Sequence, residues 1–178
     1  MNARKLVVIE IFILLLVTST ILTSCGGDNM HSKKPSINFF ELIGNESIDD
    51  ICLTIYYISP SVLTRFPWTV DNLIDSHKYK VVVDGNSLEE HLDLFKQISN
   101  DDLVPVKKKS SLDARIYYVL ESKKHGTLFD VVMWGGNDDG DSIYVNGFEV
   151  KGNDIFYDVI IPFLPDGLAQ ELREYAGF

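Results

Sequence analysis

The stretch ARIYYVLESKKHGTLFDVVMW, residues 114–134, decides the fold class of this chain. Residues 114–121 and 127–134 are rich in β-branched and aromatic side chains, which is typical of strands. The five residues between them end on Gly126, which can adopt the positive φ that a tight connection often requires. Strands joined by so short a connection pair antiparallel, because a parallel pair needs a crossover of about a dozen residues or more. The stretch therefore predicts an antiparallel hairpin.

A second hairpin is predicted by SIYVNGFEV, residues 142–150. Its centre is Asn146-Gly147, the preferred pair for a two-residue type I′ turn, in which both central residues have positive φ. Two earlier apolar runs, residues 51–58 and 79–83, are bounded by acidic residues, glycine or proline and predict two further strands.

The clearest helix signal lies at residues 88–98. Ser87 and Glu90 form a capping-box pattern, in which a hydroxyl and a carboxylate satisfy two N–H groups at the start of a helix. A predicted apolar face then follows at helical spacing, formed by Leu88, Leu92, Phe95 and Ile98. Shorter helical segments are expected at residues 38–43, at residues 69–74, from Asn153 or Asp154 to a break at Pro162, and after Gly167.

This order of strands and helices predicts an α+β fold, in which an antiparallel sheet carries helices packed on one face. The composition supports a substantial core, because 46% of the residues are hydrophobic and 24% are charged. Residues 37–178 show no internal repeat and no second linker, so we expect them to form a single domain.

The first 25 residues have the order of a secretory signal. Arg4 and Lys5 give a basic start, residues 6–21 are mainly apolar, and Leu22-Thr23-Ser24-Cys25 follows. This pattern resembles the leader of bacterial lipoproteins, whose lipobox places two small residues before a cysteine. The resemblance implies that lipoprotein signal peptidase removes residues 1–24 and that the Cys25 thiol carries a diacylglyceryl group. The residues that it implies the peptidase recognises are Leu22, Thr23 and Ser24.

Such a chain is expected to lie on the extracytoplasmic face of a cell membrane, anchored by the lipid on Cys25. Residues 25–36 are polar, contain glycine and show no periodicity, so we expect a flexible tether between the lipid and the domain. Two alternatives stay open, namely a leader that remains as an uncleaved membrane anchor and secretion without lipid. All three leave the domain outside the cytoplasm.

The net charge of −10 argues against nucleic acid as a partner, because phosphate groups repel an acidic domain.

The cysteine count bears on stability. If Cys25 carries lipid, Cys52 has no partner in the chain, and the apolar run around it predicts a small, buried side chain. Without an internal disulfide, the stability of the domain has to come from packing.

Two groups of side chains are candidates for a site. The loop at 137–141 concentrates Asp138, Asp139 and Asp141, whose oxygens are the ligands that a hard cation such as calcium prefers. The spacing does not fit an EF-hand, and Gly, Asn and Asp are also common in loops for backbone reasons. Trp68 and Trp134 either form a contact surface for a sugar or a protein or cap the ends of the core.

No signature of catalysis accompanies these residues in the sequence. The chain lacks the G-x-S-x-G and S-x-x-K patterns of serine nucleophiles, and its four histidines lack zinc-ligand spacing. The sequence therefore favours a non-enzymatic binding or accessory protein that needs no cofactor. Its expected partners are the membrane, through lipid on Cys25, and an envelope protein or glycan. The alternative is an envelope hydrolase or metal-dependent enzyme that uses residues 137–141.

Overall fold

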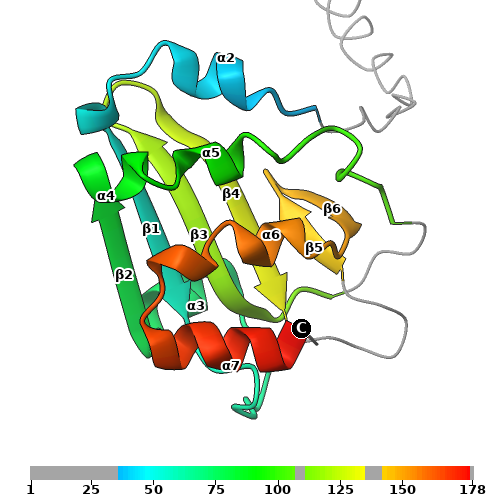
Figure 1. Ribbon diagram of the computed structural model, residues 1–178. Coiled ribbons are helices and arrows are strands. Elements are labelled where there is room, and N and C mark those ends of the chain that lie inside the picture. The colour runs from blue at the N-terminus through cyan, green and yellow to red at the C-terminus, as the bar shows by residue number, and fades with distance from the viewer. Residues whose placement is uncertain (1–35, 107–110, 135–141, 177–178) are drawn as a thin grey trace, which may run out of the picture. The chain divides into compact units, whose positions relative to one another are not determined.

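The computed structural model describes residues 36–106, 111–134 and 142–176. These residues form an open, six-stranded antiparallel sheet in the order β2-β1-β3-β4-β5-β6 (Figure 1). The predicted α+β class, an antiparallel sheet with packed helices, is confirmed. The predicted leader and all but the last residue of the predicted tether lie outside the described residues. The strands are β1 (Ile51–Tyr57), β2 (Tyr79–Asp84), β3 (Ala114–Ser122), β4 (Gly126–Trp134), β5 (Ser142–Val145) and β6 (Phe148–Lys151).

Both predicted hairpins are confirmed, together with the glycines that close them. Gly126, at the turn between β3 and β4, has φ +71°. In the turn between β5 and β6, Asn146 has φ +48° and Gly147 has φ +76°, the two positive values that a type I′ turn requires. Asn146 also exchanges two hydrogen bonds of 2.9 Å with the backbone of Asp130, so the second hairpin is fixed to β4.

Six helical segments cover one face of the sheet and bury the main hydrophobic core (Figure 1). Aromatic rings form its centre: the Phe39 and Phe129 centroids are 4.7 Å apart, and those of Phe129 and Tyr118 are 6.2 Å apart. The buried Tyr118 hydroxyl donates a 3.0 Å hydrogen bond to the carbonyl of Phe156, which satisfies its polar atom. The segments are α2 (Phe39–Gly44), α4 (Gly85–Glu89), α5 (Leu92–Phe95), α6 (Ile155–Asp158), the 3₁₀ helix η2 (Ile161–Phe163) and α7 (Asp166–Ala176).

One helix, α3 (Val70–Ser76), lies on the opposite face of the sheet (Figure 1). A capping box starts it, because the Thr69 hydroxyl accepts the N–H of Asn72 at 3.2 Å and the Asn72 side chain accepts the N–H of Thr69 at 3.1 Å. Its buried Leu73 belongs to a small apolar cluster that also contains Ile58, Ala114 and Val132.

The predicted continuous helix over residues 88–98 is wrong. The chain forms α4 and α5 separately, and His91 between them has φ −119° and ψ 5°. Gly85, at φ +52°, starts α4 directly after β2, so Ser87 falls inside the helix and cannot cap it. The predicted apolar face is nevertheless buried, because Leu88, Leu92, Phe95 and Ile98 all pack into the main core.

Both predicted C-terminal helices are present, with bounds that differ from the prediction. The Asn153 side chain accepts the N–H of Ile155 at 3.2 Å and so caps α6. The helix ends before the predicted break, because α6 stops at Asp158 and Pro162 lies in the first turn of the separate 3₁₀ helix η2. The last helix, α7, begins at Asp166 and turns Leu168 and Leu172 toward the core.

The two edges of the sheet differ in how they are covered. At β6, the N–H of Lys151 donates to the carbonyl of Val104 at 2.8 Å, and Pro105 forms a bridge with Val150. At the other edge, β2 pairs with β1 over six residues, and among the described residues no strand pairs with its second side.

Gly147→Ala is expected to lower the free energy of unfolding by about 1–2 kcal/mol, because a residue with a Cβ is strained in the left-handed conformation. Gly44→Ala is the matched control, since φ at Gly44 is not positive and an added Cβ meets no atom within 4 Å. Urea denaturation followed by circular dichroism measures both variants. Equal destabilisation by the two substitutions contradicts the expectation.

Candidate functional site

Several predicted site residues lie outside the part of the chain that the structure describes. They are the lipidation residue Cys25, the lipobox residues Leu22, Thr23 and Ser24, and the carboxylates Asp138, Asp139 and Asp141. The lipid anchor and the cation site therefore stay predictions.

The structure brings the backbones of the two predicted tryptophans to one place. Trp134 ends β4, where its backbone pairs with Ala114, and its side chain lies outside the described part. The carbonyl of Trp68 accepts the N–H of Ala114 at 2.8 Å, so both tryptophans flank the same residue. The half-buried Trp68 side chain packs against the small apolar cluster beside α3.

Trp68 closes residues 59–68, here called the 59–68 loop, which leave the end of β1. A buried arginine fixes the middle of this loop: Nη2 of Arg115, a residue only 6% exposed, donates to the Thr64 hydroxyl at 2.9 Å and to Oδ2 of Asp113 at 2.7 Å. The other oxygen of Asp113 accepts the N–H of Trp68 at 2.8 Å. One arginine–aspartate pair therefore holds both the middle and the end of the loop.

The start of the 59–68 loop is fixed to α7. The buried Ser59 hydroxyl donates to the carboxylate of Glu171 and lies 2.7 Å from the Ser61 hydroxyl. Glu171 also faces Tyr57, and burial together with the charge of that carboxylate holds the pKa of Tyr57 well above its usual value. The loop is thus anchored at its start, middle and end.

Between these fixed points the 59–68 loop exposes three large apolar side chains. Leu63 is 97% exposed, Phe66 is 67% exposed and Val62 is 38% exposed, and the Arg65 guanidinium lies 5.4 Å from the Phe66 ring centroid. Leaving a leucine or phenylalanine side chain in water forgoes about 1.5–3 kcal/mol of burial free energy. Apolar side chains that a fold holds together in solvent mark contact surfaces.

None of these three side chains is among the site candidates that the sequence predicts. The available signal was a pair of aliphatic residues and a phenylalanine between Pro60 and Pro67, with neither strand nor helix periodicity. Such a run has no face to bury, so it can project from the surface.

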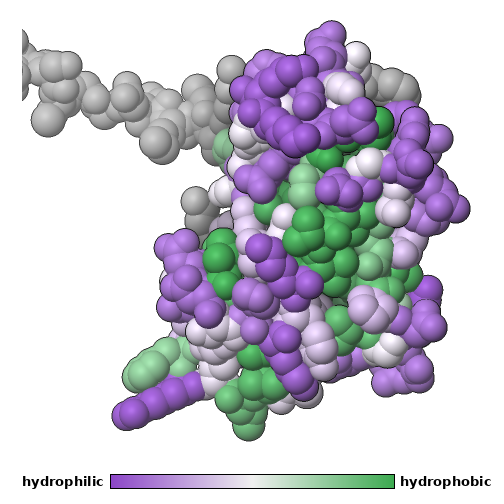
Figure 2. Space-filling view, turned by 90° about the vertical axis from the view of Figure 1, so that its left-hand side faces the viewer, coloured by the Kyte–Doolittle hydropathy of each residue, from purple (hydrophilic) through white to green (hydrophobic). Residues whose placement is uncertain are grey.

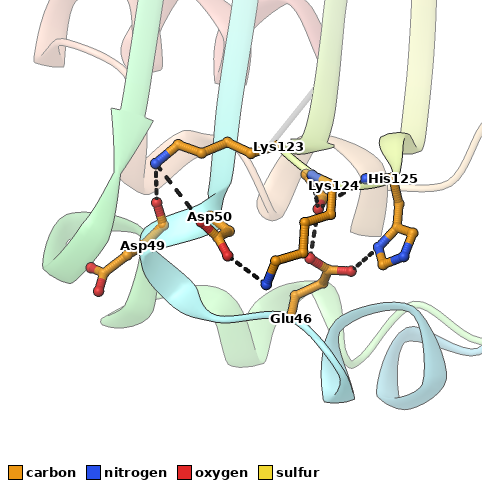
Figure 3. Close-up of polar contacts among 7 residues, drawn as sticks. Glu46, Asp49, Asp50, Lys123, Lys124 and His125 are labelled. Atoms are coloured by element: carbon orange, nitrogen blue, oxygen red, sulfur yellow. Dashed lines mark hydrogen bonds and ion pairs between the residues drawn. The ribbon is translucent and has the colours of Figure 1, made fainter.

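A cluster of charged side chains gathers at the opposite end of β1 (Figure 3). Glu46 lies between α2 and the 3₁₀ helix η1 (Ile48–Asp50), and its side chain is only 2% exposed. One carboxylate oxygen accepts the Ser122 hydroxyl at 2.5 Å, and the other pairs with Nδ1 of His125. The Ser122 hydrogen bond foremost, aided by His125 and Lys124, lowers the pKa of Glu46 below its ordinary value.

Lys123 and Lys124, in the turn between β3 and β4, contact the residues just before β1 (Figure 3). Nζ of Lys124 lies 2.8 Å from the carboxylate of Asp50, and its hydrogen bond is the main reason that the pKa of Asp50 is lowered. Nζ of Lys123 donates to the carbonyl of Asp49 at 2.6 Å. Together with Glu46, these contacts tie the β3–β4 turn to the start of β1.

The Glu46 cluster has the residue types of a serine triad but not its geometry. In a triad the histidine stands between the carboxylate and the nucleophilic hydroxyl, where it removes the proton. Here the Glu46 carboxylate stands between Ser122 and His125. Ser122 is only 4% exposed, and its oxygen also accepts the N–H of Lys124 at 3.1 Å. The arrangement therefore anchors a hairpin and offers no activated nucleophile.

A cavity of about 400 Å³ lies beside this cluster, between α2, η1 and α5. Its volume falls within the range of small-molecule sites, and Phe39, Ile43 and Leu92 are among its apolar lining residues. Its charged lining residues are Glu46, Glu89, Asp93 and Lys96, of which Glu46 is held by Ser122 and His125 while Asp93 and Lys96 pair with each other at 2.6 Å. Most of its charge is thus already engaged within the protein.

Comparison of the chain with protein-family models, with curated proteins and with solved structures finds no match. Within residues 36–106, 111–134 and 142–176, no three His, Cys, Asp or Glu side chains gather as a metal would require. In the same residues, no helix combines the length and the hydropathy needed to cross a membrane.

Glu46→Gln is expected to flatten the acid side of the stability curve. A carboxylate whose pKa is lower in the folded state stabilises the fold above its unfolded pKa, and this contribution disappears as the pH falls through the folded pKa. The free energy of unfolding of the unchanged chain should therefore fall below about pH 4.5 more steeply than that of Glu46→Gln.

Urea denaturation at a series of pH values measures this difference. Glu89→Gln is the matched control, because Glu89 lines the same cavity but is exposed. The control should keep the profile of the unchanged chain, and identical acid profiles for the two variants would show that Glu46 has no such role.

Proposed function

We propose that this protein is an extracytoplasmic lipoprotein, anchored to a membrane by lipid on Cys25, that acts by binding another protein through the 59–68 loop. The exposure of Leu63 and Phe66 on a loop fixed at its start, middle and end carries the binding proposal. The lipobox pattern that ends at Cys25 supports the anchoring proposal. The proposal includes no catalysis, because the Ser122 hydroxyl, the His125 imidazole and the Glu46 carboxylate hold the β3–β4 hairpin in place.

The chemistry of the loop favours a protein over a glycan as the partner. Sugar rings stack on flat aromatic faces, whereas Val62 and Leu63 are aliphatic and need an apolar pocket. Arg65 gives the loop a positive charge, and residues 59–70 contain no carboxylate although the whole chain carries −10. Arginine and aromatic side chains are also enriched at the energetic centres of protein interfaces. The partner surface should therefore be an apolar pocket with carboxylates at its rim.

The position of the loop leaves it free to bind. Helix α2, which the first described residues enter, lies at one end of the sheet, and the 59–68 loop leaves the other end of β1 (Figure 1). The seven residues of β1 span about 23 Å. The first described residues therefore lie far from the loop.

A metal-dependent enzyme that uses Asp138, Asp139 and Asp141 stays a prediction, because that loop lies outside the described residues. The geometry of the described residues gives this alternative no support.

Mass spectrometry of the membrane fraction is expected to find an N-terminal peptide that begins at Cys25 and carries a diacylglyceryl group on its thiol. Cys25→Ser should retain the leader and lack lipid, because the acceptor thiol is gone. Cys52→Ser is the matched control and should be processed normally. A native chain that begins at Met1 without fatty acid overturns the anchoring proposal.

A photo-crosslinking amino acid placed at position 63 of the full chain is expected to give one discrete protein adduct in cells. The same group at exposed Glu174 on α7 should give none. Adding Phe66→Asp should reduce the adduct at position 63 by about tenfold, because truncating a central contact typically costs an interface more than 1 kcal/mol.

The free energy of unfolding of each variant serves as the control. Because Leu63 and Phe66 are exposed, replacing them should change it by less than about 0.5 kcal/mol. Equal adducts from positions 63 and 174, or an adduct that ignores Phe66→Asp, count against the loop as the binding surface.

A further inference from the structure

Strand β2 presents an uncovered apolar edge. Figure 2 views the molecule from the side that β2 borders, and apolar side chains reach the surface there. The strand contains three successive valines, of which Val82 is 55% exposed, and it begins with Tyr79, which is 39% exposed. Its six residues pair one to one with β1, so the strand is regular and carries no bulge.

Exposed strand edges offer unpaired N–H and C=O groups to other strands, and natural proteins usually block them. The β6 edge follows this rule, because residues 104–105 cover it. The β2 edge lacks proline, and its one lysine, Lys80, points along the sheet with its Nζ 5.1 Å from the Tyr56 ring centroid. An edge that is regular and has three valines at its centre is suited to pairing with another strand.

We propose that β2 pairs antiparallel with β2 of a second copy of this chain, about a twofold axis that passes between the two Val82 residues. In this register Val82 lies opposite Val82 of the second copy, and Val81 lies opposite Val83. Lys80 then lies opposite Asp84 on both sides of the axis. The six strands of each copy join into one continuous sheet with an isologous interface.

Charge complementarity selects this occupant and this register. Lys80, Val82 and Asp84 alternate along the strand and therefore share one face of the sheet, where Lys80 and Asp84 are exposed. Opposite charges that face each other across a strand pair stabilise it, and like charges destabilise it. Moving the axis by one residue, to Val81, places Lys80 opposite Val82 and removes both of these charge pairs. The strand is thus complementary to itself in one register.

Cysteine cross-linking of the full chain tests the register directly. In a Cys52→Ser background, Val82→Cys should form an intermolecular disulfide, because directly opposite residues have Cα atoms about 4.5–5.5 Å apart. Lys80→Cys is the matched control, since its two copies lie about 13 Å apart along the strands, beyond the reach of a disulfide. Mixing Lys80→Cys chains with Asp84→Cys chains should restore the link. The parent Cys52→Ser chain retains Cys25, so the amount of disulfide-linked dimer that it forms measures the background.

Exchanging the two charges provides a second test. The dissociation constant of the dimer is measured by sedimentation of the detergent-solubilised full chain. Lys80→Asp and Asp84→Lys should each weaken the dimer by about tenfold or more, because each places like charges opposite one another. The double variant should recover the original affinity.

A chain that sediments as a monomer, or a dimer that ignores both single substitutions, overturns the proposal. Equal cross-linking from positions 80 and 82 overturns the register. None of these positions belongs to the 59–68 loop or the lipobox, so failure here is distinct from failure of the proposed function.

Discussion

The burial of β1 and β3 against one layer of aromatic and aliphatic side chains is the interaction on which this fold depends. Leu53, Ile55 and Tyr57 of β1 are all fully buried, and they pair with buried residues of β3. The covering helices α4, α5 and α6 contain only four or five residues each, too few to be stable by themselves in water. Cys52 is a free thiol, so within the described residues packing supplies this stability.

The elements that could be predicted from the sequence are those whose signals are local. Asn146-Gly147 and Gly126 define turns by their own backbone preferences, and the strands beside them follow from residue type. Residues 88–98 do not form one helix, because the backbone leaves helical geometry at His91, although the predicted apolar face is buried. The Glu46 cluster could not be predicted, because Ser122 and His125 lie 76 and 79 residues away along the chain. The acidic loop and the lipobox remain expectations from sequence.

The two ends of the central sheet are held in different ways, and the difference bears on function. At one end, Glu46 pairs with Ser122 and His125 while Lys124 pairs with Asp50, and these contacts close the β3–β4 turn onto β1. At the other end, Arg115 and Asp113 hold the base of the 59–68 loop, while its tip carries Leu63 into solvent. Polar contacts thus serve the fold at both ends, and the second end also exposes Leu63 and Phe66. Folding alone does not explain the exposure of these two side chains.

The two proposals together determine where the binding loops lie in a dimer. An antiparallel strand pair between two β2 edges has its twofold axis perpendicular to the sheet, so the two copies run in opposite directions. The 59–68 loop follows one end of β1 (Figure 1). The two loops would therefore project from opposite ends of the dimer. Two 59–68 loops on one dimer raise the effective concentration for the second contact, so that two contacts that are weak singly bind more tightly together.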